Sequence, residues 1–151
     1  MLLTDLLHPD RVRVPLAATD KPGVLRELTS LLAERTGAGA EELLHAVEER
    51  EAVLSTGIGL GVAVPHGKTP AVAALEMACG VTAAPVPFDA LDGEPCRLFF
   101  LLVGPESAAG EHVKALSRIA RLVRREDVRQ QLLAATTPEA FVRAVADAEA
   151  R

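Results

Sequence analysis

Four glycines, one proline and one histidine lie within the eleven residues GIGLGVAVPHG, from Gly57 to Gly67. Glycine lets the backbone approach another group closely and adopt positive φ, while a proline of fixed φ directly precedes His66. Because an imidazole titrates near pH ~6.5, a neutral and nucleophilic ring is present at neutral pH. The pattern indicates that His66 sits on a rigid corner, placed for chemistry. The other interpretation is a histidine that caps a carbonyl group at a strand end.

Neither of two familiar phosphate-binding motifs fits this glycine-rich stretch. A dinucleotide-binding fingerprint requires G-x-G-x-x-G between a strand and a helix, but here the third glycine, Gly61, is misplaced and the glycines precede the β-prone residues. Gly67-Lys68-Thr69 resembles the end of a P-loop, but Val62 occupies the position of its first glycine. Pro65 also lacks the N–H group that a phosphate cradle needs. We therefore exclude ATP-driven chemistry at this loop.

Helical periodicity places two more polar side chains on faces that point inward. One predicted helical face carries Leu43, Val47, Arg50 and Leu54. Arg50 is therefore either an anion ligand aimed at the loop that follows it or an arginine whose stem covers apolar surface. A second face carries His112, Leu116, Ile119 and Val123. His112 is then at a helix N-terminus that attracts anions, unless it is an ordinary buried histidine. His8 and His45 lie outside these patterns.

Composition limits the partners and the location of the protein. With 151 residues the chain is long enough for one domain with a real core, and its formal charge is −5. It has no basic run, no Trp and no Tyr, so we expect no nucleic-acid binding. An acidic surface instead favours a basic protein partner.

No targeting, membrane or metal signal is present in the sequence. No apolar run approaches the roughly 18 residues of a membrane span, and the N-terminus lacks the pattern of a signal peptide. Cys79 and Cys96 are isolated in strand-like segments, which is typical of buried thiols in a reducing compartment. We therefore predict a cytoplasmic protein without membrane insertion, disulfide or metal site.

The elements that must position these residues can be read from capping and periodicity. Asp20 is predicted to cap a helix with Pro22 in its first turn and Gly37 at its end. Pro65 is expected to turn the chain, because it cannot continue a central strand. The predicted strands are Val12–Leu16, Val62–Val64, Met77–Pro85 and Cys96–Val103. The other predicted helices are about Ala40–Leu54, a short turn at Thr69–Leu75, Gly110–Arg124, Asp127–Ala134 and Pro138–Ala148.

The order β-α-α-β-β-β-α-α-α predicts an α/β protein with a mixed β-sheet of four to five strands, flanked by helices on both faces. Residues 98–103 form a continuous apolar run, so this strand is expected to be central and covered on both sides. There are no repeats, linkers or low-complexity segments, and residues 1–151 are interpreted as a single domain.

Together these residues resemble the enzyme IIA component of the fructose/mannitol class, type 2, of the bacterial phosphoenolpyruvate-dependent sugar phosphotransferase system. The resemblance extends from about Leu6 to Glu149. It is carried by Arg50-Glu51, by Ser55-Thr56-Gly57-Ile58-Gly59, by Val64-Pro65-His66-Gly67 and by Glu111-His112 with Leu116-Ser117. One departure is Leu60, where many members of the family have Asn, so that a polar contact near the site is missing.

The resemblance implies a role for each site residue. His66 would accept a phosphoryl group from the small carrier protein HPr, and His112 would be a second active-site histidine that contacts the phosphate or the first ring. Arg50 would lie near the phosphoryl group, where its planar fork of donors suits phosphate oxygens. The hydroxyl groups of Ser55 and Thr56 would add further contacts. Such a transfer depends on positioning and charge stabilisation, and it requires no cofactor.

Three functions follow as alternatives. The chain has no fused HPr, IIB or IIC portion, so it would act in trans. It is expected to be either a stand-alone IIA of the nitrogen-regulatory type, which acts on a regulatory protein target, or a sugar-transport IIA that passes phosphate to a IIB component. The solitary length and His66-Gly67-Lys68 favour the regulator. The third alternative is a protein-binding module without phosphorylation, which His66 and His112 argue against.

Overall fold

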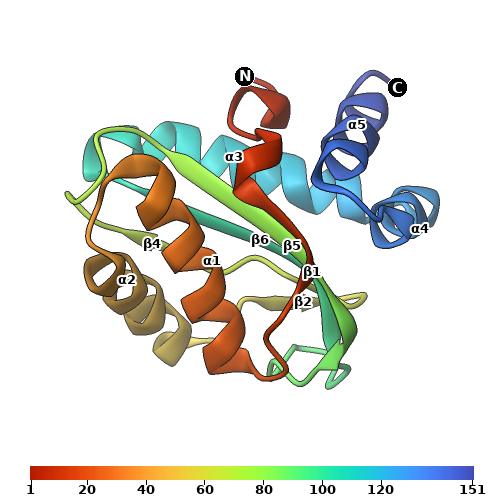
Figure 1. The fold of residues 1–151 in the computed structure, drawn as a ribbon, viewed down its shortest axis with the longest axis horizontal. Coiled ribbons are helices and arrows are strands. Elements are labelled where there is room, and N and C mark those ends of the chain that lie inside the picture. Colours follow the sequence, from red (N-terminus) through yellow and green to blue (C-terminus); the bar gives the residue numbers. More distant parts are fainter.

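One mixed β-sheet separates two groups of helices (Figure 1). The computed structural model describes residues 1–151. Its elements are β1 (Val12–Leu16), α1 (Lys21–Thr36), α2 (Ala40–Val53), β2 (Gly57–Gly59), β3 (Val62–Ala63), β4 (His66–Lys68), β5 (Glu76–Val86), β6 (Cys96–Gly104), α3 (Ala109–Val123), α4 (Glu126–Ala134) and α5 (Pro138–Glu149). The strand order is β1-β5-β6-β3-β2, and β4 also pairs with β6.

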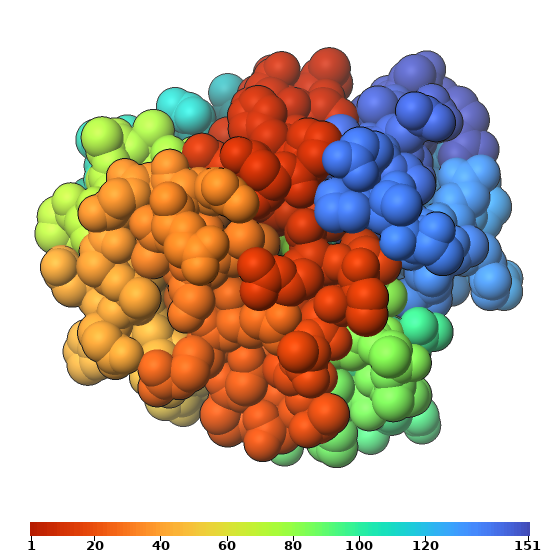
Figure 2. All heavy atoms as spheres, in the orientation of Figure 1, coloured from red at the N-terminus to blue at the C-terminus, as the bar shows by residue number.

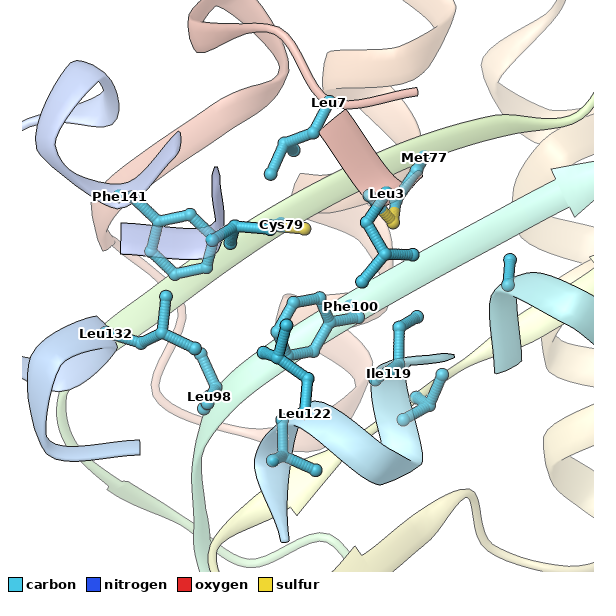
Figure 3. Close-up of a cluster of buried hydrophobic side chains, with 14 of the residues drawn as sticks. Leu3, Leu7, Met77, Cys79, Leu98, Phe100, Ile119, Leu122, Leu132 and Phe141 are labelled. Carbon is cyan, nitrogen blue, oxygen red and sulfur yellow. The ribbon is translucent and has the colours of Figure 1, made fainter. Parts of the chain in front are cut away.

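The helices cover both faces of the sheet, as predicted. In Figure 1, α1 and α2 lie on one side and α3, α4 and α5 on the other. Side chains of β6 alternate between the two cores: Phe99 packs among residues of α1 and α2, whereas Phe100 packs among residues of the C-terminal helices. Figure 3 shows the second core, where Ile119, Leu132 and Phe141 come from three different helices. The strand β6 is central and buried on both faces, which confirms the expectation from its apolar run.

The predicted helix ends are confirmed by their capping groups. Asp20 Oδ1 accepts a hydrogen bond from Gly23 N–H at 2.8 Å, and Gly37 ends α1 with φ +78°. Thr137 caps α5 in the same way, through Ala140 N–H at 3.1 Å. Short polar side chains and glycine satisfy the free backbone groups at helix ends, so these boundaries follow from local sequence.

The sheet has six strands, so the expectation of four to five strands is wrong. The additional strands, β2 and β4, have three residues each. β2 pairs antiparallel with β3, and β4 pairs parallel with β6. Segments this short and rich in glycine have little β-propensity of their own. Their pairing depends on backbone contacts that no local pattern reveals.

The predicted turn at Pro65 is also wrong. Ala63 pairs with Phe99 and His66 pairs with Leu102, so β3 and β4 follow β6 in the same register on both sides of the proline. Pro65 cannot donate to the ladder, but its carbonyl group accepts a hydrogen bond from Leu102 N–H at 3.0 Å. The proline interrupts the strand without changing its direction, so the direction in which the His66 side chain points is set by the sheet.

No helical turn forms over residues 69–75. Thr69 N–H continues the strand pairing by donating to Gly104 O at 2.9 Å, and Ala71 N–H then donates to Thr69 Oγ1 at 3.1 Å. Such local bonds from threonine offer the backbone an alternative to the helix. The segment is a non-helical turn that leads into β5.

The N-terminal segment closes the C-terminal core. Leu3 and Leu7 are buried there (Figure 3), and Figure 2 shows the first residues between α1 and the C-terminal helices. Glu149 of α5 accepts hydrogen bonds from the N–H groups of Leu3, at 2.7 Å, and Thr4, at 3.2 Å. These bonds hold the two ends of the chain together. None of the helices combines the length and apolarity needed to cross a membrane.

Candidate active site

The rings of His66 and His112 meet edge to face, with centroids 5.3 Å apart and an angle of 72° between their planes. His66 is the first residue of β4, and His112 lies in the first turn of α3. Sequence analysis singled out these two of the four histidines, and the fold brings them together across 46 residues of chain.

Gly67 determines which way His66 points. An added Cβ at Gly67 would lie 2.7 Å from the carbonyl carbon and oxygen of Ala46 in α2, so β4 packs directly on that helix. Because side chains alternate along a strand, the neighbours His66 and Lys68 point to the other face. That face is the one that α3 covers, which explains the contact with His112.

His66 is held as a neutral imidazole with a free Nε2. Its Nδ1 lies 2.8 Å from Val64 O, and because a carbonyl oxygen only accepts, Nδ1 carries the proton and Nε2 keeps its lone pair. The ring is half-buried. Burial lowers the pKa of His66 below 6.5, the Val64 bond opposes this shift, and the Arg50 guanidinium lowers the pKa further. The strand-end bond to a carbonyl group therefore coexists with a nucleophilic Nε2.

His112 is only 4% exposed, and neither of its ring nitrogens has a hydrogen-bond partner. Burial lowers its pKa to about 4, with contributions from His66 and Lys68. A buried polar group without a partner costs free energy. Neither nitrogen of the ring next to His66 is therefore satisfied within the protein.

Arg50 is close enough to influence His66 through its charge. Its Nη1 donates a hydrogen bond to Leu54 O at 2.7 Å, near the end of α2. The guanidinium has five N–H donors, and this is its one hydrogen bond within the protein. The remaining donors are free for an anion, and a role for Arg50 as an anion ligand stays a prediction. The predicted inward face is wrong at its end, because α2 ends at Val53 and Leu54 is 57% exposed.

Ser55 and Thr56 use their hydroxyl groups within the protein. Ser55 Oγ donates to Phe88 O at 2.6 Å and accepts from Gly57 N–H at 3.1 Å. Thr56 Oγ1 donates to Glu51 Oε1 at 2.5 Å. Both residues anchor the start of the glycine-rich segment, so a phosphate contact from either hydroxyl requires rearrangement and stays a prediction.

Sequence analysis missed the role of Glu51 in holding this segment. Its carboxylate is buried and accepts from Thr56 N–H at 2.9 Å as well as from the Thr56 hydroxyl. Lys21 Nζ pairs with Glu51 Oε2 at 2.8 Å and lies 4.8 Å above the Phe88 ring. The network ties the first turn of α1 and the last turn of α2 to the glycine-rich segment. Glu51 and Thr56 are only five residues apart, but local sequence does not reveal their pairing with Lys21 and Phe88, which are more than 25 residues away in the chain.

Lys68 is a second residue that sequence analysis missed. It shares a strand face with His66, lies close enough to lower the pKa of His112, and pairs loosely with Glu106 at 3.6 Å. Its position two residues after His66 was a usable signal, once the segment is known to be a strand rather than a corner.

The other candidate groups are not part of the site. His45 is exposed and pairs with Glu49 at 2.9 Å, and His8 is exposed near the N-terminus. Cys79 and Cys96 are free buried thiols, as predicted, and burial raises the pKa of Cys96 to about 11. No group of three His, Cys, Asp or Glu side chains is arranged to hold a metal ion.

A neutral nucleophilic ring, a second buried imidazole without partners and two nearby cations make a site suited to accepting an anionic group. This combination on a mixed sheet with helices on both faces fits a phosphotransferase component. The chain belongs to the family described as phosphoenolpyruvate-dependent sugar phosphotransferase system, EIIA 2, whose model matches residues 5–148.

Its curated relatives include both regulatory and sugar-transport proteins. The nitrogen regulatory protein of Bradyrhizobium diazoefficiens is 39% identical over 93% of this chain and 92% of its own length. That of Pseudomonas aeruginosa is 37% identical over 97% of this chain and 96% of its own length. The fructose-specific EIIABC component of Bacillus subtilis is 34% identical over 94% of this chain, which corresponds to 22% of that longer protein.

The fold is also that of solved family members. The nitrogen regulatory protein IIA-Ntr from Neisseria meningitidis superposes with a TM-score of 0.89 at 30% identity, covering 95% of this chain and 98% of that one. The IIA component in a complex with phosphorylated IIB of the Escherichia coli mannitol system superposes with a TM-score of 0.79 at 19% identity, covering 93% and 97% of the two chains. At that identity the match establishes the fold.

Proposed function

We propose that this protein, as one EIIA type-2 domain over residues 1–151, is a phosphohistidine carrier that accepts a phosphoryl group on His66 Nε2 from an HPr-like protein. The observation that carries the proposal is the pair of imidazoles, one with a free Nε2 and the other buried with two unpartnered nitrogens, 5.3 Å apart. Family membership supports a phosphotransfer role in general terms.

The transfer is an in-line displacement that needs no cofactor. The Nε2 lone pair of His66 attacks phosphorus, the bond between phosphorus and the donor's imidazole nitrogen breaks, and that nitrogen leaves with the electron pair. The transition state spreads negative charge over three equatorial oxygens. His66 must be neutral to attack, and its lowered pKa keeps it so at neutral pH.

The neighbouring side chains supply the donors for this charge. An N–H of His112 can donate to a phosphoryl oxygen, which would satisfy a group that has no partner in the free protein. Arg50 offers its unused guanidinium donors, and Lys68 supplies a point charge from the same strand face as His66. Ser55 and Thr56 act through the backbone of the glycine-rich segment that they anchor.

Phosphoryl transfer can be tested with phosphoenolpyruvate, enzyme I and HPr, followed by mass spectrometry of the acid-labile phosphate. We expect one phosphate on His66 and none in His66→Ala, whereas the control His45→Ala is labelled like the wild type. His112→Ala and Arg50→Ala should slow labelling by about 10²–10³-fold, the effect of losing one charge-stabilising donor. Label on His45, or full labelling of His66→Ala, would contradict the proposal.

Of the two physiological roles, we favour the nitrogen-regulatory one, in which the phosphorylation state acts on a protein target. This chain aligns with nearly the full length of the relatives of that type, at 39% and 37% identity. The second candidate is phosphoryl transfer to a sugar-specific IIB protein, which the match to the fructose-specific component supports. The two roles can be distinguished by mixing the phosphorylated protein with a fructose-class IIB. Rapid transfer of the label to IIB supports the transport role.

A further inference from the structure

The outward face of α3 carries a line of cations. Lys114, Arg118 and Arg121 recur at intervals of four and three residues, so they lie on one face of the helix, and Arg125 follows just beyond its end as the N-cap of α4. This face points away from the core, since Lys114 and Arg121 are exposed and the other two are partly exposed. We call these four side chains the α3 basic stripe.

Two members of the α3 basic stripe have no partner in a protein that pairs most of its cations. Of the 16 Lys and Arg side chains, nine pair with a carboxylate and three donate only to a backbone carbonyl group. The four with neither are Lys114, Arg121, Arg124 and Arg143. Unneutralised positive charge therefore gathers on α3, although the chain as a whole carries −5.

Arg118 is held only loosely by its carboxylate. Arg118 Nη1 lies 3.8 Å from Glu149 Oε2, and that same oxygen accepts a hydrogen bond from Leu3 N–H at 2.7 Å. The other Glu149 oxygen is used by Thr4. Glu149 is thus committed to the N-terminal segment, and the Arg118 head group can bind another anion without breaking a strong ion pair.

A groove accompanies the α3 basic stripe. Its volume is about 450 Å³, and its lining residues are Met1, Val113, Lys114, Ser117, Arg118 and Arg121. A second hollow of about 200 Å³ shares Arg118 and Arg121 with it and continues to Arg125. Arg118 and Arg121 therefore line both hollows.

We propose that the α3 basic stripe docks an acidic segment of a partner protein, with carboxylates along about 10 Å, the rise of the seven helical steps from Lys114 to Arg121. An extended segment with an acidic side chain at every second residue presents a carboxylate about every 6.6 Å on one side, close to the rise between Lys114 and Arg118. The charge of the stripe is complementary to such a segment. This surface goes beyond the phosphoryl site and does not depend on it.

A polynucleotide fits the α3 basic stripe less well. All four phenylalanines are buried, and the chain has neither Trp nor Tyr, so no aromatic ring is available to stack with bases. Asp127 lies against Arg125 and Arg151 at the end of the stripe, and it would repel a continuous phosphate backbone. An acidic peptide bound along Lys114, Arg118 and Arg121 ends before this carboxylate.

The stripe and the phosphoryl site occupy different faces of α3. His112 is buried against the sheet, whereas Lys114, two residues and about 200° further around the helix, is exposed. Substitutions in the stripe are therefore expected to leave phosphorylation of His66 intact, so the two proposals fail independently.

The test uses the full chain and a short synthetic peptide in which Glu alternates with Ser, with the Gln-for-Glu peptide as the neutral comparison. We expect the Glu peptide to bind at about 0.1 M salt, to be released at about 1 M, and to shift the amide resonances of residues 113–125. Lys114→Glu/Arg121→Glu should bind the peptide at least about tenfold more weakly, since two attractions become repulsions.

Arg143→Glu is the matched control. Arg143 is an exposed cation of α5 that also lacks a partner, and its reversal changes the net charge as much as Arg121→Glu alone. We expect Arg121→Glu to weaken binding and Arg143→Glu to leave it nearly unchanged. The proposal is overturned if both reversals weaken binding equally or if the Glu peptide does not bind. It is also overturned if the Gln peptide binds equally well, or if a single-stranded oligonucleotide binds more tightly.

Discussion

His112 connects the chemistry of the site with the stability of the fold. It is 4% exposed with two unpartnered nitrogens, an arrangement that costs free energy in the resting protein. In the proposed function, a phosphoryl oxygen on His66 would supply the hydrogen-bond partner that His112 lacks, which would offset this free-energy cost. The same burial gives His112 a pKa of about 4, which makes folding itself sensitive to pH.

We predict that acid destabilises the protein through His112. Its pKa is about 4 when folded and 6.5 when unfolded, so between these values the unfolded chain binds more protons than the folded one. The free energy of unfolding is therefore fully present above pH 6.5 and falls as the pH drops toward 4, by an amount on the order of 3 kcal/mol. His112→Leu should remove this part of the slope in urea unfolding measured across that range.

The control for this experiment is His45→Leu, because His45 is 75% exposed and its removal should leave the pH dependence of unfolding unchanged. Carboxylates also titrate in acid, and comparing the variants cancels their contribution. If the free energy of unfolding depends on pH in the same way in wild type and His112→Leu, protonation of His112 is not coupled to folding.

At the residue scale, sequence reasoning found the histidine pair but not its surroundings. His66 was marked by the glycines and proline beside it, and His112 by its place on a helical stripe. Glu51 and Lys68 were missed for two different physical reasons. Glu51 acts through Thr56 and Lys21, whose proximity is created by the fold. Lys68 required knowledge that residues 66–68 are a strand.

The strand β4 and the helix α2 form the element pair that aims His66. Their backbones are in direct contact at Gly67, where a Cβ would lie 2.9 Å from Val47 N and nearer still to the Ala46 carbonyl group. Because both neighbours are backbone atoms of a helix, no rotamer change can make room. This close approach explains why a glycine follows the proposed nucleophile.

We predict that Gly67→Ala both destabilises the fold and slows phosphorylation. Overpacking of this kind costs about 1–3 kcal/mol, and displacing His66 by about 1 Å lowers the rate by up to about 10²-fold. Thermal unfolding and the initial labelling rate measure the two effects. Gly110→Ala is the control, since nothing lies within 4 Å of the added Cβ. It should leave the labelling rate unchanged and should not lower stability, because alanine is the better helix former in α3. Wild-type behaviour of Gly67→Ala would exclude the contact as a constraint.

The turn between β2 and β3 explains the departure at Leu60. Gly59, Leu60 and Gly61 all have positive φ, with Leu60 at +61°. Asparagine adopts this conformation much more readily than leucine. The Leu60 side chain is 55% exposed, while its N–H donates to Asp92 Oδ2 at 3.2 Å. An asparagine at this position would therefore be favoured by backbone conformation alone, without a polar contact to the phosphoryl group.

We predict that Leu60→Asn stabilises the protein by about 0.5–1 kcal/mol, through relief of left-handed strain, and leaves the phosphorylation rate at saturating phosphorylated HPr unchanged. Urea unfolding and the labelling assay test the two parts. Leu91→Asn is the control, because Leu91 is an exposed turn leucine that does not have positive φ. A faster rate in Leu60→Asn would restore the interpretation that a polar contact is missing.

At the element scale, the helices were predictable and the short strands were not. Asp20, Gly37 and Thr137 mark helix ends by chemistry that operates within a few residues. By contrast, β2 and β4 exist because β3 and β6 offer them backbone partners. The error at Pro65 has the same origin, since the loss of one N–H donor was taken as the end of the strand although the carbonyl group keeps its bond to Leu102.

Over the whole molecule, exposed apolar side chains gather around the glycine-rich segment. Most of the large exposed hydrophobic residues come from this region: Val53, Leu54, Ile58, Leu60 and Leu91. Leu91 joins the group because its N–H donates to Gly57 O at 3.1 Å. Arg50 donates to Leu54 O, so this apolar patch reaches the proposed phosphoryl site. Asp89 pairs with Lys21, and Asp92 accepts a hydrogen bond from the Leu60 N–H group. These two aspartates give the patch an acidic rim.

A phosphoryl donor must place its own phosphohistidine within reach of His66, so we predict that an HPr-like protein docks on this apolar patch. Leu54→Gln removes apolar contact without changing charge, and it should raise the KM for phosphorylated HPr by about fivefold or more, as for an interface side chain worth about 1 kcal/mol. Because the acidic rim is intact, binding should still weaken as salt rises, with the same slope as in the wild type. Leu2→Gln alters an exposed leucine of the N-terminal segment and should change neither quantity. Equal effects of the two variants, or binding that strengthens with salt, would place the docking surface elsewhere.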